Sequence, residues 1–141
     1  MLQRVDISLI IPGARRQQLN MPEKEILIVE DETITQNMLK TALANAGYAP
    51  IIAKSGAEAI QLANERVPSL IILDIMLPDI DGGEVAGLLK KDARTKDIPI
   101  IFLSALISEA EEKVAAKYDV ASFLSKPFNR EKLLNEIKKY L

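Results

Sequence analysis

The chain has 141 residues, of which 48% are hydrophobic and 27% charged, and its formal net charge is −2. This balance is typical of one globular domain, and such a small charge gives no electrostatic reason to expect nucleic acid or an anionic membrane as a partner. The absence of cysteine excludes disulfides and thiolate chemistry and suits the reducing cytoplasm, where we expect the protein. The absence of histidine excludes an imidazole base or metal ligand, so any chemistry must use carboxylates, hydroxyls and amines.

Residues 1–22 do not share the pattern of the rest of the chain. Their short apolar patch, Ile7–Ile11, is broken by Pro12-Gly13 and lacks the length and cleavage pattern of a signal peptide. No apolar run in the chain reaches the roughly 20 residues that span a bilayer. We expect an N-terminal extension over residues 1–22, with an added edge strand or helix as the alternative, and one domain over residues 23–141.

From residue 25 onward, short apolar runs alternate with amphipathic segments. Continuous apolar runs of this length are typical of strands buried on both faces, and we expect strands at residues 25–30, 50–53, 70–74, 98–103 and 120–124. Between and after them we expect helices at residues 33–46, 55–66, 83–91 and 108–118, and a last one that Asn129 caps.

Local signals support these helices. Gly47 is expected to end the first helix, whose buried stripe would be Ile34, Met38, Leu39, Ala42 and Leu43. Capping boxes open the second and fourth helices, at Ser55-Gly56-Ala57-Glu58 and Ser108-Glu109-Ala110-Glu111. The last helix would bury Leu133, Leu134, Ile137 and Tyr140.

Five strands alternating with five helices predict an α/β fold with a parallel sheet covered on both faces and right-handed crossovers. The usual arrangement at this size is the flavodoxin-like (βα)5 three-layer sandwich, with strand order 2-1-3-4-5.

Polar residues stand at four of the five expected strand ends. Glu30-Asp31 follows the first strand, Asp74 ends the third, Ser104 the fourth and Lys126 the fifth. In a parallel sheet these ends share one edge, which would gather three carboxylates, a hydroxyl and an ammonium. Such carboxylates suit Mg²⁺, and an aspartate beside it can act as a nucleophile towards phosphorus, with lysine and serine stabilising the phosphoryl oxygens.

Each residue also has a purely structural explanation. Asp74 alone would be a turn or cap residue, and Glu30-Asp31 could simply favour the positive end of the next helix. Ser104 could be an N-cap, and Lys126 a solvated strand end. Complementary groups at four strand ends are improbable by chance, so the joint pattern favours a phosphoryl acceptor site.

The separated motifs together resemble the receiver domain of bacterial two-component response regulators, over roughly residues 24–141. They comprise Glu30-Asp31, Asp74 with Met76-Leu77-Pro78 and Asp81-Gly82, Ser104-Ala105, and Lys126-Pro127-Phe128. The resemblance implies that Asp74 is the phosphoacceptor, and that Mg²⁺ is bound by Glu30, Asp31, Asp74 and the carbonyl of Met76.

The resemblance also implies the roles of three further residues. Ser104 would be the switch hydroxyl and Phe123 the switch aromatic. Lys126 would contact the phosphoryl group, and the peptide bond between Lys126 and Pro127 would be cis.

The resemblance implies partners as well. The phosphodonor would be a sensor histidine kinase or a phosphotransfer protein. A downstream protein or domain would bind the face formed by the fourth helix, fifth strand and last helix, with no direct contact to nucleic acid or membrane, and the domain would be a monomer or weak homodimer.

Three other functions compete with this one. A haloacid-dehalogenase-like Mg²⁺-dependent phosphatase also uses a nucleophilic aspartate, but it needs a second aspartate where this chain has Met76. A flavin-binding module would need a phosphate-cradling loop where Glu30-Asp31 would repel the phosphate. A scaffold without activity is disfavoured by the intact acidic set.

Overall fold

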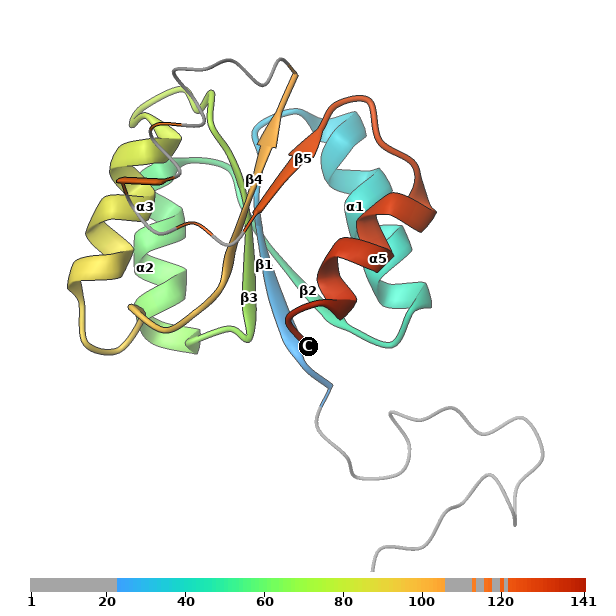
Figure 1. The fold of residues 1–141 in the computed structure, drawn as a ribbon, viewed down its shortest axis with the longest axis horizontal. Coiled ribbons are helices and arrows are strands. Elements are labelled where there is room, and N and C mark those ends of the chain that lie inside the picture. Colours follow the sequence, from blue (N-terminus) through green and yellow to red (C-terminus); the bar gives the residue numbers. More distant parts are fainter. Residues whose placement is uncertain (1–22, 106–112, 114–115, 118–119, 121) are drawn as a thin grey trace, which may run out of the picture.

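The computed structural model describes residues 23–105, 113, 116–117, 120 and 122–141 (Figure 1). The strands are β1 Glu25–Val29, β2 Ala49–Ala53, β3 Leu70–Asp74, β4 Ile100–Ser104 and β5 Ser122–Ser125. The helices are α1 Thr33–Asn45, α2 Gly56–Arg66, α3 Gly82–Lys91 and α5 Arg130–Lys138. Of the helix expected at residues 108–118, residues 113 and 116–117 are described and helical, whereas its capping box and the rest lie outside the described residues.

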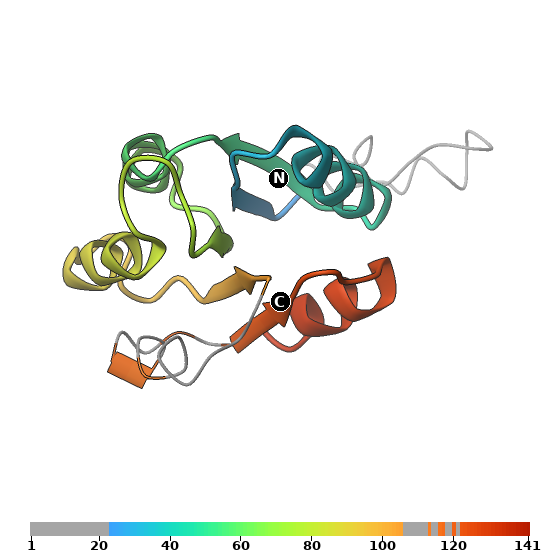
Figure 2. The same ribbon diagram turned by 90° about the horizontal axis from the view of Figure 1, so that it is seen from above.

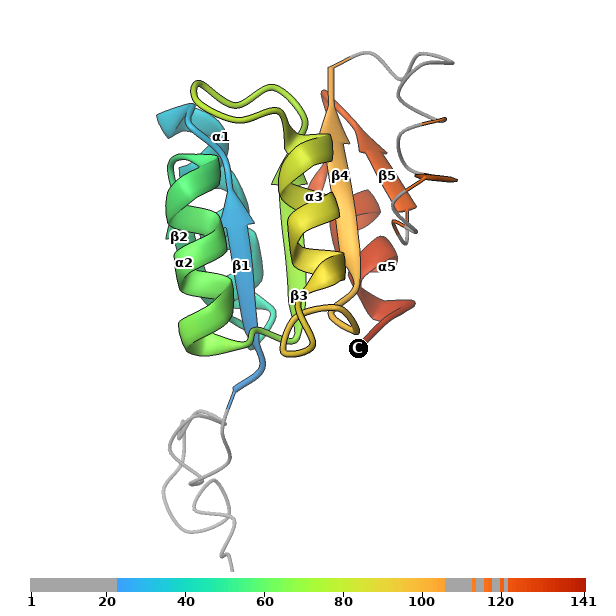
Figure 3. The same cartoon turned by 90° about the vertical axis from the view of Figure 1, so that its left-hand side faces the viewer.

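All strands pair in parallel in one sheet of order β2-β1-β3-β4-β5, which confirms the predicted flavodoxin-like topology. Among the described residues, α1 and α5 cover one face of the sheet and α2 and α3 the other (Figures 1 and 2). The side view shows α2 and α3 running alongside each other over the strands (Figure 3). None of the described helices has the length and apolar character needed to cross a membrane.

The strands contribute alternate residues to two separate hydrophobic clusters, because successive side chains of a strand point to opposite faces. In β3, Ile71 and Leu73 join the cluster beneath α2 and α3, whereas Leu70 and Ile72 join the one beneath α1 and α5. The central strands β1, β3 and β4 are fully or almost fully buried, apart from Glu25 at the start of β1. This burial on both faces explains their continuous apolar sequences.

The buried face of α1 differs from the predicted one. Leu39, Ala42 and Leu43 are buried as expected, but Ile34 is 79% exposed and Met38 is 45% exposed, so the prediction was wrong for these two residues. Thr35 and Gln36 are buried in their place. The true stripe is therefore rotated by about one residue and reaches polar positions near the start of the helix.

Most predicted helix ends are confirmed. Gly47 adopts a left-handed φ of 90° just after α1, which glycine does without steric cost. The side chains of Ser55 and Asn129 accept hydrogen bonds from the amides of Glu58 and Lys132, and so cap α2 and α5.

Other boundaries and the burial of α5 differ slightly from the prediction. The last two strands begin two residues later than expected, at Ile100 and Ser122. In the predicted stripe of α5, the fully buried residues are Leu133 and Ile137, while Leu134 and Tyr140 are partly buried.

Candidate functional site

The register of the strands places the predicted site residues at one edge of the sheet. Val29 of β1 pairs with Leu73 of β3, so the next position along each strand brings Glu30 beside Asp74. On the other side of β3, Asp74 pairs with Leu103, which places Ser104 one residue farther along β4. Lys126 follows β5 directly, and its amide donates to the Ser104 carbonyl at 2.7 Å.

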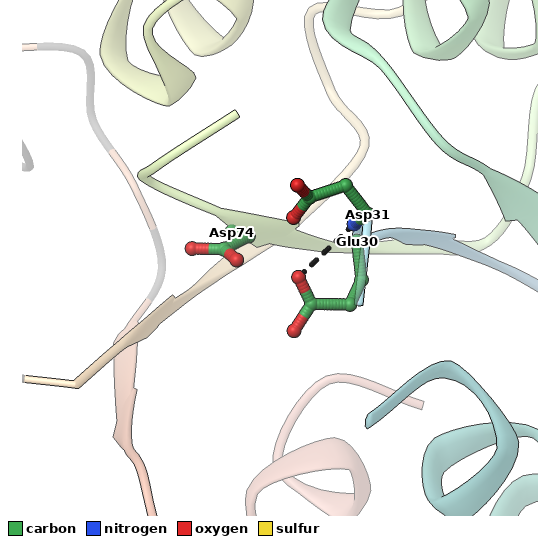
Figure 4. Close-up of side chains that lie close together, drawn as sticks. All are labelled: Glu30, Asp31 and Asp74. Atoms are coloured by element: carbon green, nitrogen blue, oxygen red, sulfur yellow. Dashed lines mark hydrogen bonds between the residues drawn. The ribbon is translucent and has the colours of Figure 1, made fainter. Parts of the chain in front are cut away.

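The three carboxylates form one cluster. Ligand oxygens of Glu30, Asp31 and Asp74 all lie within 4.8 Å of one another (Figure 4). Glu30 is fully buried and Asp74 is 6% exposed, whereas Asp31 is exposed. The Asp31 amide donates to Glu30 Oε2 at 3.1 Å, and the Met76 amide donates to Asp74 Oδ1 at 3.0 Å. The cluster is therefore held by backbone groups and opens to solvent on its Asp31 side.

Lys126 provides the positive charge of the site. Its ammonium Nζ lies 2.6 Å from Glu30 Oε1 and 3.2 Å from Asp74 Oδ2. Burial of the ammonium opposes its charge, but the Glu30 and Asp74 carboxylates outweigh this and raise the pKa of Lys126 above its ordinary value. The peptide bond between Lys126 and Pro127 is cis, as predicted.

Glu30 has an unusual protonation equilibrium for a carboxyl group. Burial, followed by the neighbouring Asp74 carboxylate, raises the pKa of Glu30 from 4.5 to about 7, although Lys126 acts in the opposite direction. Near neutral pH, Glu30 is therefore partly protonated in the metal-free protein. Any cation that binds the cluster would favour its ionised form.

The other predicted residues lie in β4, in β5 and in the loop after β3. Ser104 is buried at the end of β4. Phe123 is half-buried in β5, and its ring centroid is 5.9 Å from that of Phe102. Met76 is 79% exposed, and its backbone amide bonds to Asp74.

The family is decided by comparison with known proteins. Residues 26–138 match the model of the response regulator receiver domain. The chain belongs to the response regulator receiver domain family. Receiver domains are the switch modules of two-component signal transduction rather than classical enzymes.

Individual relatives agree with this assignment. The chain is 34% identical over 118 residues to the polar-differentiation response regulator DivK of Brucella ovis, an alignment that covers 84% of this chain and 96% of that protein. The chemotaxis protein CheY4 of Vibrio cholerae has a TM-score of 0.82 and 28% identity, over 85% of this chain and all of CheY4. The receiver domain of a Pseudomonas aeruginosa sensor histidine kinase, whose structure has magnesium in its active site cleft, has a TM-score of 0.79 and 25% identity, over 84% and 98% of the two chains.

The donor set of this receiver domain fits a hard divalent cation. Three carboxylates supply oxygen ligands from two adjacent strand ends, and one of them is exposed enough to leave room for water. Mg²⁺ prefers carboxylate oxygens and retains several waters, which matches this partly open arrangement.

One residue near the site was not found by sequence reasoning. Gln36 is buried in the first turns of α1, and its Nε2 donates to the Glu30 carbonyl at 2.5 Å. It thereby ties α1 to the backbone that presents Glu30 and Asp31. A glutamine in a helix ordinarily faces solvent, so the sequence contains no signal that would have marked it.

Proposed function

We propose that this receiver domain is a Mg²⁺-dependent phosphoacceptor in which Asp74 takes a phosphoryl group from a sensor histidine kinase or a phosphotransfer protein. The proposal rests on one observation: a nearly buried aspartate, two further carboxylates and a lysine lie close together at one edge of the sheet. A small acyl phosphate would serve as an alternative donor.

Four groups would hold the metal, namely Glu30, Asp31, Asp74 and the Met76 carbonyl. Bound there, Mg²⁺ would neutralise negative charge on the phosphoryl oxygens during transfer. Glu30 would release its proton when the metal binds, since its pKa of about 7 leaves it partly protonated near neutral pH.

The transfer itself involves one bond formed and one broken. A carboxylate oxygen of Asp74 attacks phosphorus, and the bond between phosphorus and the donor's imidazole nitrogen breaks. The bonding pair returns to the imidazole, which takes a proton from solvent. The Lys126 ammonium, already 3.2 Å from Asp74 Oδ2, stabilises the phosphoryl oxygens, and the Ser104 hydroxyl donates to one of them.

The new phosphoryl group carries about −1.5 to −2 charges, which draws Ser104 towards it. The half-buried Phe123 then turns inwards, and the face that includes β5 and α5 changes its affinity for an output protein or domain. The switch shifts this equilibrium only as far as the partner distinguishes the two states.

Phosphatase activity towards small esters is disfavoured. A haloacid-dehalogenase-like mechanism needs a proton donor two residues after the nucleophile. That position is Met76, whose thioether has no proton to give and whose side chain is 79% exposed.

The test is phosphorylation by acetyl phosphate with Mg²⁺, followed by intact mass measurement. The wild type should gain one phosphoryl group, and Asp74→Asn should gain none. Asp97→Asn is the matched control, because Asp97 is exposed and precedes β4 at the opposite end of the sheet. Labelling of Asp74→Asn, or steady hydrolysis of p-nitrophenyl phosphate by the wild type, would overturn the proposal.

A further inference from the structure

The loop between β3 and α3, residues 75–81, is hydrogen-bonded to the start of α2 by the side chain of Asp79. Asp79 Oδ1 accepts the Gly56 amide at 2.8 Å, and Asp79 Oδ2 accepts the Ala57 amide at 3.0 Å. Ser55, the N-cap residue, accepts the Glu58 amide at 3.2 Å. Asp79 therefore satisfies two of the amides that a helix start leaves without an intrahelical partner, although it belongs to another segment of the chain.

Packing and charge reinforce this attachment. A methyl group added at Gly56 would lie 2.9 Å from Val85 Cγ2 and 3.0 Å from Ile80 Cβ, so the start of α2 is in close contact with the loop and with α3. The two amide hydrogen bonds lower the pKa of Asp79, which keeps its carboxylate charged at neutral pH. A negative charge is favourable at the positive end of a helix.

The same loop adjoins the proposed phosphoacceptor Asp74. It begins directly after Asp74, and its Met76 amide donates to Asp74 Oδ1 at 3.0 Å. Its other end is closed by a bond of 2.8 Å from the Gly82 amide to the Ile75 carbonyl. Backbone amides thus hold both ends of the loop, and between them Asp79 bonds to the start of α2 while Ile80 packs against it.

We propose that Asp79 is a positioning residue for the site: by holding residues 75–81 against α2, it keeps the Met76 backbone in place beside Asp74. None of the hydrogen bonds found for Asp79 in the described part of the chain reaches the acidic cluster. The inference rests on the proposed function in so far as the Met76 carbonyl is a metal ligand.

Three variants of the full chain separate this role from simple helix capping. Asp79→Ala removes both acceptors of the α2 amides, and Asp79→Asn retains one of them. Ser55→Ala removes the remaining side-chain cap of the same helix without touching the loop. The measurements are the Mg²⁺ dissociation constant by calorimetry, amide hydrogen exchange at Met76 by NMR, and the midpoint of thermal unfolding.

Asp79→Ala should weaken Mg²⁺ binding about tenfold, as loss of an orienting partner typically does. It should also speed hydrogen exchange of the Met76 amide about tenfold, because the loop opens more often. Asp79→Asn should recover part of both effects. Ser55→Ala should lower the unfolding midpoint similarly but leave Mg²⁺ affinity and Met76 exchange within about twofold of wild type.

If Asp79→Ala and Ser55→Ala lower the midpoint alike and neither changes Mg²⁺ affinity or Met76 exchange, Asp79 is only a helix cap and the inference is wrong. A wild type that takes up no phosphoryl group would instead overturn the proposed function. The exchange of Met76 still decides the role of Asp79 in that case, because it requires neither metal nor phosphodonor.

Discussion

Among single residues, Glu30 combines complete burial with an ionisable group. Its pKa is raised from 4.5 to about 7, so its protonated form favours the folded state. That contribution is complete below pH 4.5 and is lost as the pH rises through about 7. We expect the unfolding free energy of the metal-free protein, measured by urea denaturation, to fall by about 1–3 kcal/mol between roughly pH 5 and pH 8.

The control for this pH dependence is Glu30→Gln, whose unfolding free energy should not fall over this pH range. Other shifted groups do not interfere. The raised pKa values of Lys126 and Lys139 stabilise the fold at all pH values below 10.5, and the lowered pKa values of Asp79 and Asp92 do so at all values above 3.8. The same slope in Glu30→Gln would mean that another group causes it.

Gly82 is a second residue on which the site depends. An added methyl group would lie 2.5 Å from the Asp74 carbonyl oxygen and 2.6 Å from Ile75 Cα, and neither backbone atom can rotate away. Gly82→Ala should therefore displace the end of β3, lower the unfolding free energy by about 2–4 kcal/mol and slow phosphoryl uptake. Urea denaturation and the rate of mass gain measure the two effects.

Gly47 provides the comparison for this substitution. It has a φ of 90° but nothing within 4 Å of an added methyl group. Gly47→Ala should cost only about 1–2 kcal/mol of backbone strain and leave phosphoryl uptake unchanged. Equal rates of uptake in Gly82→Ala and wild type would show that the end of β3 tolerates the shift.

Among the elements, α1 shows where sequence periodicity is insufficient. Ile34 and Met38 fit an apolar stripe, yet the helix buries Thr35 and Gln36 instead. Both polar side chains have partners: the Thr35 hydroxyl bonds to the Glu32 carboxylate, and Gln36 bonds to the Glu30 carbonyl. Because those partners belong to the loop before the helix, the hydrophobic pattern of α1 alone could not reveal them.

The end of α2 contains a strained residue. Val67 follows the helix with φ 43° and ψ 66°, a left-handed conformation that is costly for a β-branched side chain. Val67 is 49% exposed, so it loses little packing when replaced. Val67→Asn should raise the unfolding free energy by about 1 kcal/mol, measured by urea denaturation, because asparagine tolerates this conformation.

Val67→Ala is the control for that gain, since it removes the branch at Cβ but not the penalty of a Cβ in the left-handed region. It should therefore be less stable than Val67→Asn. A loss of stability in Val67→Asn would show that the exposed valine contributes more by packing than its backbone costs.

For the whole molecule, the topology could be predicted because strands buried on both faces have continuous apolar sequences. The strand order then brought Glu30, Asp74 and Lys126 to one edge, as the structure confirms. The sequence could not show the attachment of Asp79 to α2, because a bond across 22 or 23 residues leaves no periodic signal. The raised pKa of Glu30 was equally hidden, since it depends on how completely the surrounding elements exclude water.

Lys126 connects distant parts of the molecule, because its ammonium follows the edge strand β5 but contacts residues at the ends of β1 and β3. The carboxylates that it contacts are those proposed to hold Mg²⁺, so ammonium and dication neutralise the same charge and repel each other. Without metal, Lys126→Met should lower the unfolding free energy near pH 8 by about 1–3 kcal/mol, because Glu30 and Asp74 lose their counterion.

The same substitution should have opposite effects on metal binding and on chemistry. Lys126→Met should bind Mg²⁺ about three- to tenfold more tightly by calorimetry, since the repulsion is gone, yet take up the phosphoryl group more slowly. Lys40→Met removes an equal charge from the exposed side of α1 and should change neither quantity. Weaker Mg²⁺ binding by Lys126→Met would mean that the ammonium holds the carboxylates in their binding arrangement, and that this function outweighs its repulsion of the metal.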